Sequence, residues 1–128
     1  GKENKITFSS EIAHSPMISG GRGKDTVYIT EDCTLTGKSI ASLGRNQDQV
    51  IIDGIIHKLK IDNGDDAARD MVKISNIENI KNKLRITNFG KEDRLMLEEE
   101  VFQYNDLNNH TVKKVFREMG IVFNLLDV

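Results

Sequence analysis

The segment Asp48-Gln49-Val50-Ile51-Ile52 places an aspartate at the start of an alternating apolar run. The same form recurs in Asp25-Thr26-Val27-Tyr28-Ile29, Asp70-Met71-Val72-Lys73-Ile74 and Asp93-Arg94-Leu95-Met96-Leu97. In every copy the second and fourth residues after the aspartate are Val, Ile or Leu, whereas the residue between them varies. This alternation predicts four strands, each with one apolar face.

The spacing of these strands indicates how they are arranged. Their aspartates are 23, 22 and 23 residues apart, and a second series of short strands, residues 39–43, 59–61 and 84–86, lies between them. Turns containing glycine or asparagine follow the second series, as sharp corners require. Two strands and two corners in about 23 residues describe one coil of a parallel β-solenoid, in which neighbouring coils bury their apolar residues against one another.

We therefore predict an all-β fold, a parallel β-solenoid (β-helix or β-roll) of about four coils with a C-terminal helical cap. Residues 1–128 form a single domain in this prediction, with the repeats at about 18–97 and the cap at 98–128. An antiparallel sandwich is the alternative, because strands at intervals of about 10 to 12 residues also fit that fold. The regular interval favours the solenoid, since hairpin loops vary freely in length.

The C-terminal part has a helical period. Apolar residues at positions 112, 115, 116 and 119 fall on one face of a helix. This helix is predicted to start at Asn108 or Asn109 and to end at Gly120, with a last strand at residues 121–126. The segment would cover the open end of the solenoid, where backbone edges and core side chains are otherwise exposed.

Composition excludes several classes of function. Eighteen basic and 20 acidic residues give a net charge of -2, so no overall field attracts the chain to nucleic acid or anionic lipid. One cysteine, Cys33, excludes an internal disulfide framework and a multi-cysteine zinc site. No apolar run approaches the roughly 18 residues of a membrane span. We therefore expect neither a nucleic-acid partner nor a membrane-spanning segment.

Residues Gly20-Gly21-Arg22-Gly23-Lys24-Asp25-Thr26-Val27-Tyr28 match the nonapeptide G-G-x-G-x-D-x-U-x. In this respect the chain resembles the hemolysin-type calcium-binding proteins, or repeats-in-toxin proteins. A partial second copy spans residues 43–51, and the similarity extends with decreasing quality over about residues 18–97. The resemblance implies that glycine-rich corners and aspartates of adjacent coils hold Ca²⁺, a cation that prefers six to eight oxygen ligands.

The resemblance and the acidic corner before Asp70 together give a candidate metal site. Its members are Gly21, Gly23, Asp25, Asp48, Asp65, Asp66 and Asp70. Coils stacked at about 4.8 Å would place the repeated aspartates in a column of like charges, whose repulsion must be offset. Calcium is one candidate, and hydrogen bonds from corner amides are a second. A third is a cation beside each aspartate, from Arg22, Lys24, Arg45, Arg69 and Arg94.

The resemblance implies a non-enzymatic, calcium-associated module of a secreted bacterial toxin, adhesin or exported enzyme. Such a module aids extracellular folding or export, with the remainder of a larger protein and a cell-surface or protein partner as its partners. It would be secreted or located at the cell surface, and no catalytic residue is assigned. Two alternatives stay open: a β-helix enzyme or toxin domain acting on polysaccharide, with carboxylates such as Asp48, Asp53 and Asp70 and the amine of Lys73, and a trimeric phage-fibre or surface module.

Overall fold

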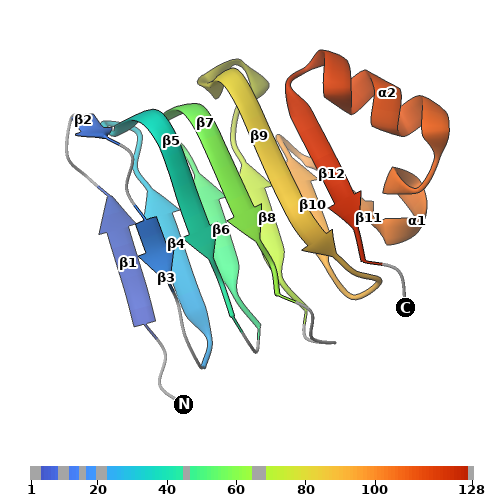
Figure 1. The fold of residues 1–128 in the computed structure, drawn as a ribbon, viewed down its shortest axis with the longest axis horizontal. Helices are drawn as coiled ribbons and strands as arrows, with labels where there is room; N and C mark the ends of the chain where they lie inside the picture. The colour runs from blue at the N-terminus through green and yellow to red at the C-terminus, as the bar shows by residue number, and fades with distance from the viewer. Residues whose placement is uncertain are drawn as a thin grey trace.

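The computed structural model describes residues 4–8, 12–14, 17–19, 23–44, 47–64 and 69–126. These residues form two sheets that face each other across a common core, with two helices at the C-terminal end (Figure 1). The chain passes repeatedly from one sheet to the other, as a solenoid does. Among the described residues, no helix is long and apolar enough to span a membrane.

The first sheet, called sheet A, contains the strands that begin at the repeated aspartates. Its order is β1-β4-β6-β8-β10-β11. The strands are β1 (Asn4–Phe8), β4 (Asp25–Ile29), β6 (Gln49–Ile52), β8 (Met71–Ile74), β10 (Arg94–Leu97) and β11 (Glu100–Gln103). All neighbours are parallel except β10 and β11, which form an antiparallel pair.

The second sheet, sheet B, has the order β12-β9-β7-β5-β2, and β3 also pairs with β5. Its strands are β2 (Ile12–His14), β3 (Met17–Ser19), β5 (Thr34–Ser42), β7 (Ile55–Asp62), β9 (Ile80–Phe89) and β12 (Ile121–Leu125). Every pair in this sheet is parallel. A 3-10 turn, η1 (Ile77–Asn79), joins β8 to β9.

The parallel pairing confirms the β-solenoid and excludes the antiparallel sandwich for the described residues. Three full turns run from Asp25 to Asp93, and a fourth starts at β10. The repeat also extends further towards the N-terminus than the expected start at residue 18, because β1 pairs in parallel with β4. The sequence of β1 lacks the aspartate-led pattern, which is why the periodicity did not reveal it.

The core consists of side chains stacked in register. Val27, Val50, Val72 and Leu95 are successive partners along sheet A, and all four are fully buried. In sheet B the corresponding buried column contains Ile61 and Ile86. Each such residue stabilises the fold by roughly 1.5–3 kcal/mol relative to an exposed position. The strictly apolar position of the repeat is therefore the position that coils bury against one another.

The C-terminal segment both caps the solenoid and completes its last turn. After β11 come α1 (Tyr104–Leu107) and α2 (His110–Glu118), and β12 then returns to sheet B beside β9. The ring of Phe116 lies edge-on to Phe102 at 5.0 Å and to Phe123 at 5.4 Å, which ties α2 to both sheets. Val115, expected on the buried face of the helix, is 50% exposed. The predicted cap is thus confirmed, with a narrower buried face than the sequence indicated.

The start of α2 provides a test of the cap. The side chain of Asn109 accepts hydrogen bonds from the backbone N–H groups of Thr111 at 2.9 Å and Val112 at 3.2 Å. Replacing Asn109 with Ala should lower the free energy of unfolding by about 1 kcal/mol, because these two N–H groups lose their acceptor. Chemical denaturation measures the change. The neighbouring Asn108→Ala variant is the control, and an equal loss in both variants would contradict the capping role.

Candidate functional site

The four repeated aspartates form a buried column at one corner of the solenoid. Asp25, Asp48, Asp70 and Asp93 are between 1% and 3% exposed. Asp48 Oδ1 accepts a hydrogen bond from the backbone N–H of Asp25 at 2.8 Å. Asp70 Oδ1 accepts from the N–H of Asp48, and Asp93 Oδ1 from the N–H of Asp70, both at 2.9 Å. We call this arrangement the aspartate ladder.

The aspartate ladder extends the backbone ladder of sheet A by one rung in each coil. The carbonyl oxygens of Asp48 and Asp70 accept hydrogen bonds from the N–H groups of Met71 and Arg94, each at 2.9 Å. The side-chain bonds lie immediately before these backbone bonds along the chain. The carboxylates of Asp48, Asp70 and Asp93 therefore provide the acceptors for buried N–H groups where strands begin, and so link each of their coils to the preceding one.

Asp93 closes the ladder at its C-terminal end. Its Oδ2 accepts a hydrogen bond from the N–H of Gly90 at 2.7 Å, within its own corner. The side-chain amide of Asn63 also approaches this oxygen, at 3.5 Å. The expectation that aspartates bond corner amides is therefore met by Oδ2 of Asp93, whereas the Oδ1 atoms of Asp48, Asp70 and Asp93 bond amides of the preceding coil. Register explains these bonds between coils, because it places each of the three carboxylates beside the backbone of the neighbouring coil.

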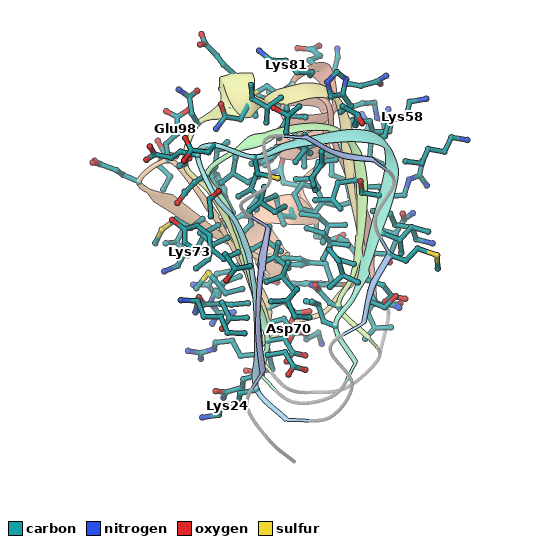
Figure 2. The ribbon with its side chains drawn as sticks, turned by 90° about the vertical axis from the view of Figure 1, so that its left-hand side faces the viewer. Lys24, Lys58, Asp70, Lys73, Lys81 and Glu98 are labelled. Carbon is teal, nitrogen blue, oxygen red and sulfur yellow. The ribbon has the colours of Figure 1, made fainter. Side chains whose placement is uncertain are left out.

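The structure brings together only some of the predicted calcium ligands. Asp25, Asp48 and Asp70 are stacked, and Gly23 lies in the same corner with a positive φ of 94°. Gly21, Asp65 and Asp66 lie outside the described residues. Figure 2 places Asp70 inside the ring of strands, towards its narrow end. Within the described ranges no group of three or more His, Cys, Asp or Glu side chains is arranged to hold a metal.

The surroundings of the stacked carboxylates do not fit a calcium shell. A surface depression of about 560 Å³ borders Asp25 and Asp48, and three cations line it: Lys5, Lys24 and Arg69. Positive charges that border the same depression oppose the binding of a divalent cation there. One oxygen of each of the Asp48 and Asp70 carboxylates also already accepts a backbone hydrogen bond between coils. The described residues alone therefore do not form the predicted site, and calcium binding stays a prediction about the corners as a whole.

Of the cations expected beside the aspartates, Lys24 and Arg69 are exposed and line that depression. Arg94 instead donates to the backbone carbonyl oxygens of Asp93 at 2.9 Å and Lys91 at 3.3 Å. Arg22 and Arg45 lie outside the described residues. Lys24 and Arg69 thus lie at the surface near Asp25 and Asp48, and Arg94 stabilises the backbone of the last corner.

The residues considered for a carboxylate-containing catalytic groove do not gather on one face. Asp48 and Asp70 belong to the buried ladder, whereas Lys73 points outward in register with Ile51. Asp53 lies at the opposite end of β6 and accepts a hydrogen bond from the hydroxyl of Tyr28 at 2.9 Å. The outward stripe expected from the repeat is present, since Tyr28, Ile51, Lys73 and Met96 are successive partners along sheet A.

Asp53 raises the pKa of Tyr28 above its ordinary value of 10.0, first through this hydrogen bond and then through its negative charge. The folded state therefore binds the phenolic proton more tightly, and the stability that this provides is lost as pH rises above about 10. In a Tyr104→Phe background, where Tyr28 is the remaining tyrosine, Asp53→Asn should shift the phenolate absorbance titration to lower pH. An unchanged titration would contradict the interaction.

The cysteine and histidine side chains that the structure describes lie on separate elements. Cys33 is fully buried, and burial raises the pKa of its thiol. Its backbone N–H and carbonyl group both take part in the corner that joins β4 to β5. His57 and His110 are exposed, one on β7 and one at the start of α2. Cys33 thus serves as a small core residue, for which low thiolate content means low reactivity.

Two surfaces emerge that the sequence interpretation missed. A groove of about 960 Å³ lies between α2 and the end of sheet A; its lining includes Leu97, Glu98, Phe102, Val115 and Met119. The second surface is the outward side of sheet B, where five exposed cations gather. We call it the cationic face and define it by Lys38, Lys58, Lys60, Lys83 and Arg85. Alternating lysines at 58 and 60 were a visible signal of it in the sequence.

The chain matches no family model, no curated protein and no solved structure.

Proposed function

We propose that this chain is a non-enzymatic β-solenoid module that supports or presents other parts of a secreted or cell-surface protein. The observation that carries the proposal is the aspartate ladder. Its carboxylates are buried in bonds between coils, so the acidic groups that repeat most regularly serve the fold rather than a reaction. Stacked coils of this kind form a rigid body with long flat faces, which suits presentation and binding.

Association with calcium is a second candidate, favoured by the complete nonapeptide at residues 20–28. In that case the corners before Asp25 and Asp70 would supply the oxygen ligands, and Ca²⁺ would stabilise the folded state. The metal would bind outside the ladder, or share carboxylates whose Oδ1 atoms accept hydrogen bonds from backbone N–H groups between coils. These two candidates differ in one measurable respect, which is whether folding depends on the metal.

Thermal unfolding in chelator and in 1 mM Ca²⁺ separates them. A module held by the aspartate ladder should unfold at the same temperature, within error, in both conditions. A site with a Kd of about 10 μM would stabilise the folded state by about 2.7 kcal/mol at 1 mM Ca²⁺, and would raise the midpoint by at least about 5 °C. Circular dichroism measures the midpoint, and Mg²⁺ at the same concentration is the control for ionic strength. A calcium-specific rise would replace the metal-independent proposal with the second candidate.

A further inference from the structure

The cationic face is an ordered array. Lys38, Lys58 and Lys83 are successive partners across β5, β7 and β9. Two residues further along the same strands, Lys60 is paired with Arg85. Neighbouring strands lie about 4.8 Å apart and alternate residues about 6.8 Å apart, so the charges form a grid at these spacings. Figure 2 shows Lys58 projecting away from the core on this side, and Lys81 extends from the top of the same sheet.

Stability does not explain this array. Like charges placed directly opposite one another on a sheet face are destabilising. Lysines often protect sheet edges against unwanted pairing, but β7 and β9 lie in the interior of sheet B. The acidic side chain at the end of β7, that of Asp62, accepts hydrogen bonds from Gly64 and the side chain of Asn88, both at 2.9 Å. Like charges gathered on interior strands, where they protect no edge, indicate a binding function.

We propose that the cationic face binds a linear acidic polysaccharide, a sugar polymer with carboxylate or sulfate groups along its length. A shallow depression of about 230 Å³ runs between the cationic side chains and includes Ile40 in its lining. Met17, which is 82% exposed, lies beside Ile40 in the sheet. The face thus combines regularly spaced cations with apolar surface, against which the stems of the lysines and the carbon faces of sugar rings can pack.

Three features favour an acidic polysaccharide over nucleic acid. Proteins that hold single strands combine cations with aromatic side chains on which bases stack. The described residues of β5, β7 and β9 include a single Phe, Tyr or Trp, namely Phe89, which is buried. A flat sheet face also cannot enter a duplex groove as a helix or a two-stranded ribbon does. Four of the five cations are lysines, which act as point charges rather than as planar forks for phosphate.

The inference does not rest on the proposed module function, and binding measurements test it with defined probes. The probes are heparin as the sulfated polymer, polygalacturonate as the carboxylated polymer and dextran as the neutral control, titrated by calorimetry at 50 mM NaCl. The wild-type chain should bind at least one acidic polymer, should not bind dextran, and should lose affinity as salt increases. The variant Lys58→Gln, Lys60→Gln, Lys83→Gln and Arg85→Gln should bind at least tenfold more weakly.

A second fourfold variant controls for net charge. Replacing Lys73, Lys91, Lys114 and Arg117 with Gln also changes the net charge from -2 to -6, but leaves the cationic face intact. Its affinity should fall less than threefold. Because the removed side chains are outward-facing, both variants should keep the wild-type circular dichroism spectrum. As a measurement free of substitutions, amide chemical shifts of the wild-type chain should change on β5, β7 and β9 when the polymer is added.

Five results would overturn the assignment. Equal losses in the two variants would reduce the effect to net charge. Tighter binding to a single-stranded oligonucleotide of thymidine would assign the face to nucleic acid, and tighter binding to phosphatidylserine vesicles would assign it to a membrane surface. Shift changes confined to sheet A or to α2 would place the binding site elsewhere. Absence of binding to either acidic polymer at 50 mM NaCl would remove the function altogether.

Discussion

Replacing Asp70 with Ala should lower the free energy of unfolding by about 4 kcal/mol. The buried N–H of Asp48 loses a charged acceptor at 2.9 Å, and a cavity opens beside it. A hydrogen bond to a charged group contributes about 1.5–3 kcal/mol, and an unsatisfied buried donor adds its desolvation cost. Asp70 also lies between two other rungs, so its removal interrupts the ladder in the middle of the solenoid. Denaturant unfolding followed by circular dichroism measures the loss.

Asp70→Asn is the matched variant, because it keeps an oxygen at the position of Oδ1 while removing the charge. It should cost about 1 kcal/mol, because the acceptor for the Asp48 N–H remains and the repulsion along the column decreases. Both variants should be measured in the presence of chelator, so that no bound metal contributes to the free energy of unfolding. If Asn were as damaging as Ala, the role of Asp70 would lie in its charge rather than in the hydrogen bond that we describe.

Replacing Gly54 with Ala should destabilise the chain by at least about 4 kcal/mol, or prevent folding. A Cβ at this position would overlap the backbone carbonyl oxygens of Thr30 and Cys33 in the preceding coil. Those carbonyl groups are held by the corner itself, since the N–H of Cys33 donates to Thr30 at 3.0 Å and that of Ile55 to Cys33 at 3.0 Å. Backbone cannot move aside as a flexible side chain can, so overpacking here is severe.

Gly90→Ala is the control for this second prediction. A Cβ at Gly90 would meet Asp93 Oδ2 and Leu126 Cδ2, each at an ordinary contact distance of 3.6 Å. Gly90 is also buried, so the two substitutions differ mainly in what the added methyl group meets. The loss for Gly90→Ala should stay below about 1 kcal/mol. Comparable losses at the two positions would mean that coils are not packed as closely at the Thr30–Cys33 corner as the structure indicates.

The sequence predicted the coils wherever one residue type repeats at a constant interval. The interval of 22 to 23 residues between aspartates indicated parallel stacking, and the pairing of Val27 with Val50 and of Val50 with Val72 confirms it. The N-terminal coil was not predicted because β1 lacks an aspartate-led segment. The antiparallel strand β11 was also not predicted. The turn before it, at Glu98, has a positive φ of 57° but contains no glycine that would indicate a reversal of the chain.

The candidate site was predicted only in part, for reasons of register and direction. The spacing identified the column of aspartates, and bonds to corner amides were among the predicted alternatives. The spacing did not show that the amides bonded by Asp48, Asp70 and Asp93 Oδ1 belong to the preceding coil. The cationic face depends on Lys38, Lys58 and Lys83, which are 20 and 25 residues apart rather than 22 or 23. Bulges after Leu35 and Ile56 bring these three lysines into register. The net charge of -2 also gave no indication of this surface, because net charge does not show where on the molecule the cations gather.

Hydrogen exchange of three backbone amides tests the aspartate ladder most directly. The N–H groups of Asp25, Asp48 and Asp70 are the donors to the ladder carboxylates. In chelator they should exchange as slowly as the core amides of β6 and β8, because they open only when coils separate. Rapid exchange of these three amides in chelator, while the neighbouring strand amides stayed protected, would contradict this role. It would mean that the carboxylates do not hold the coils together.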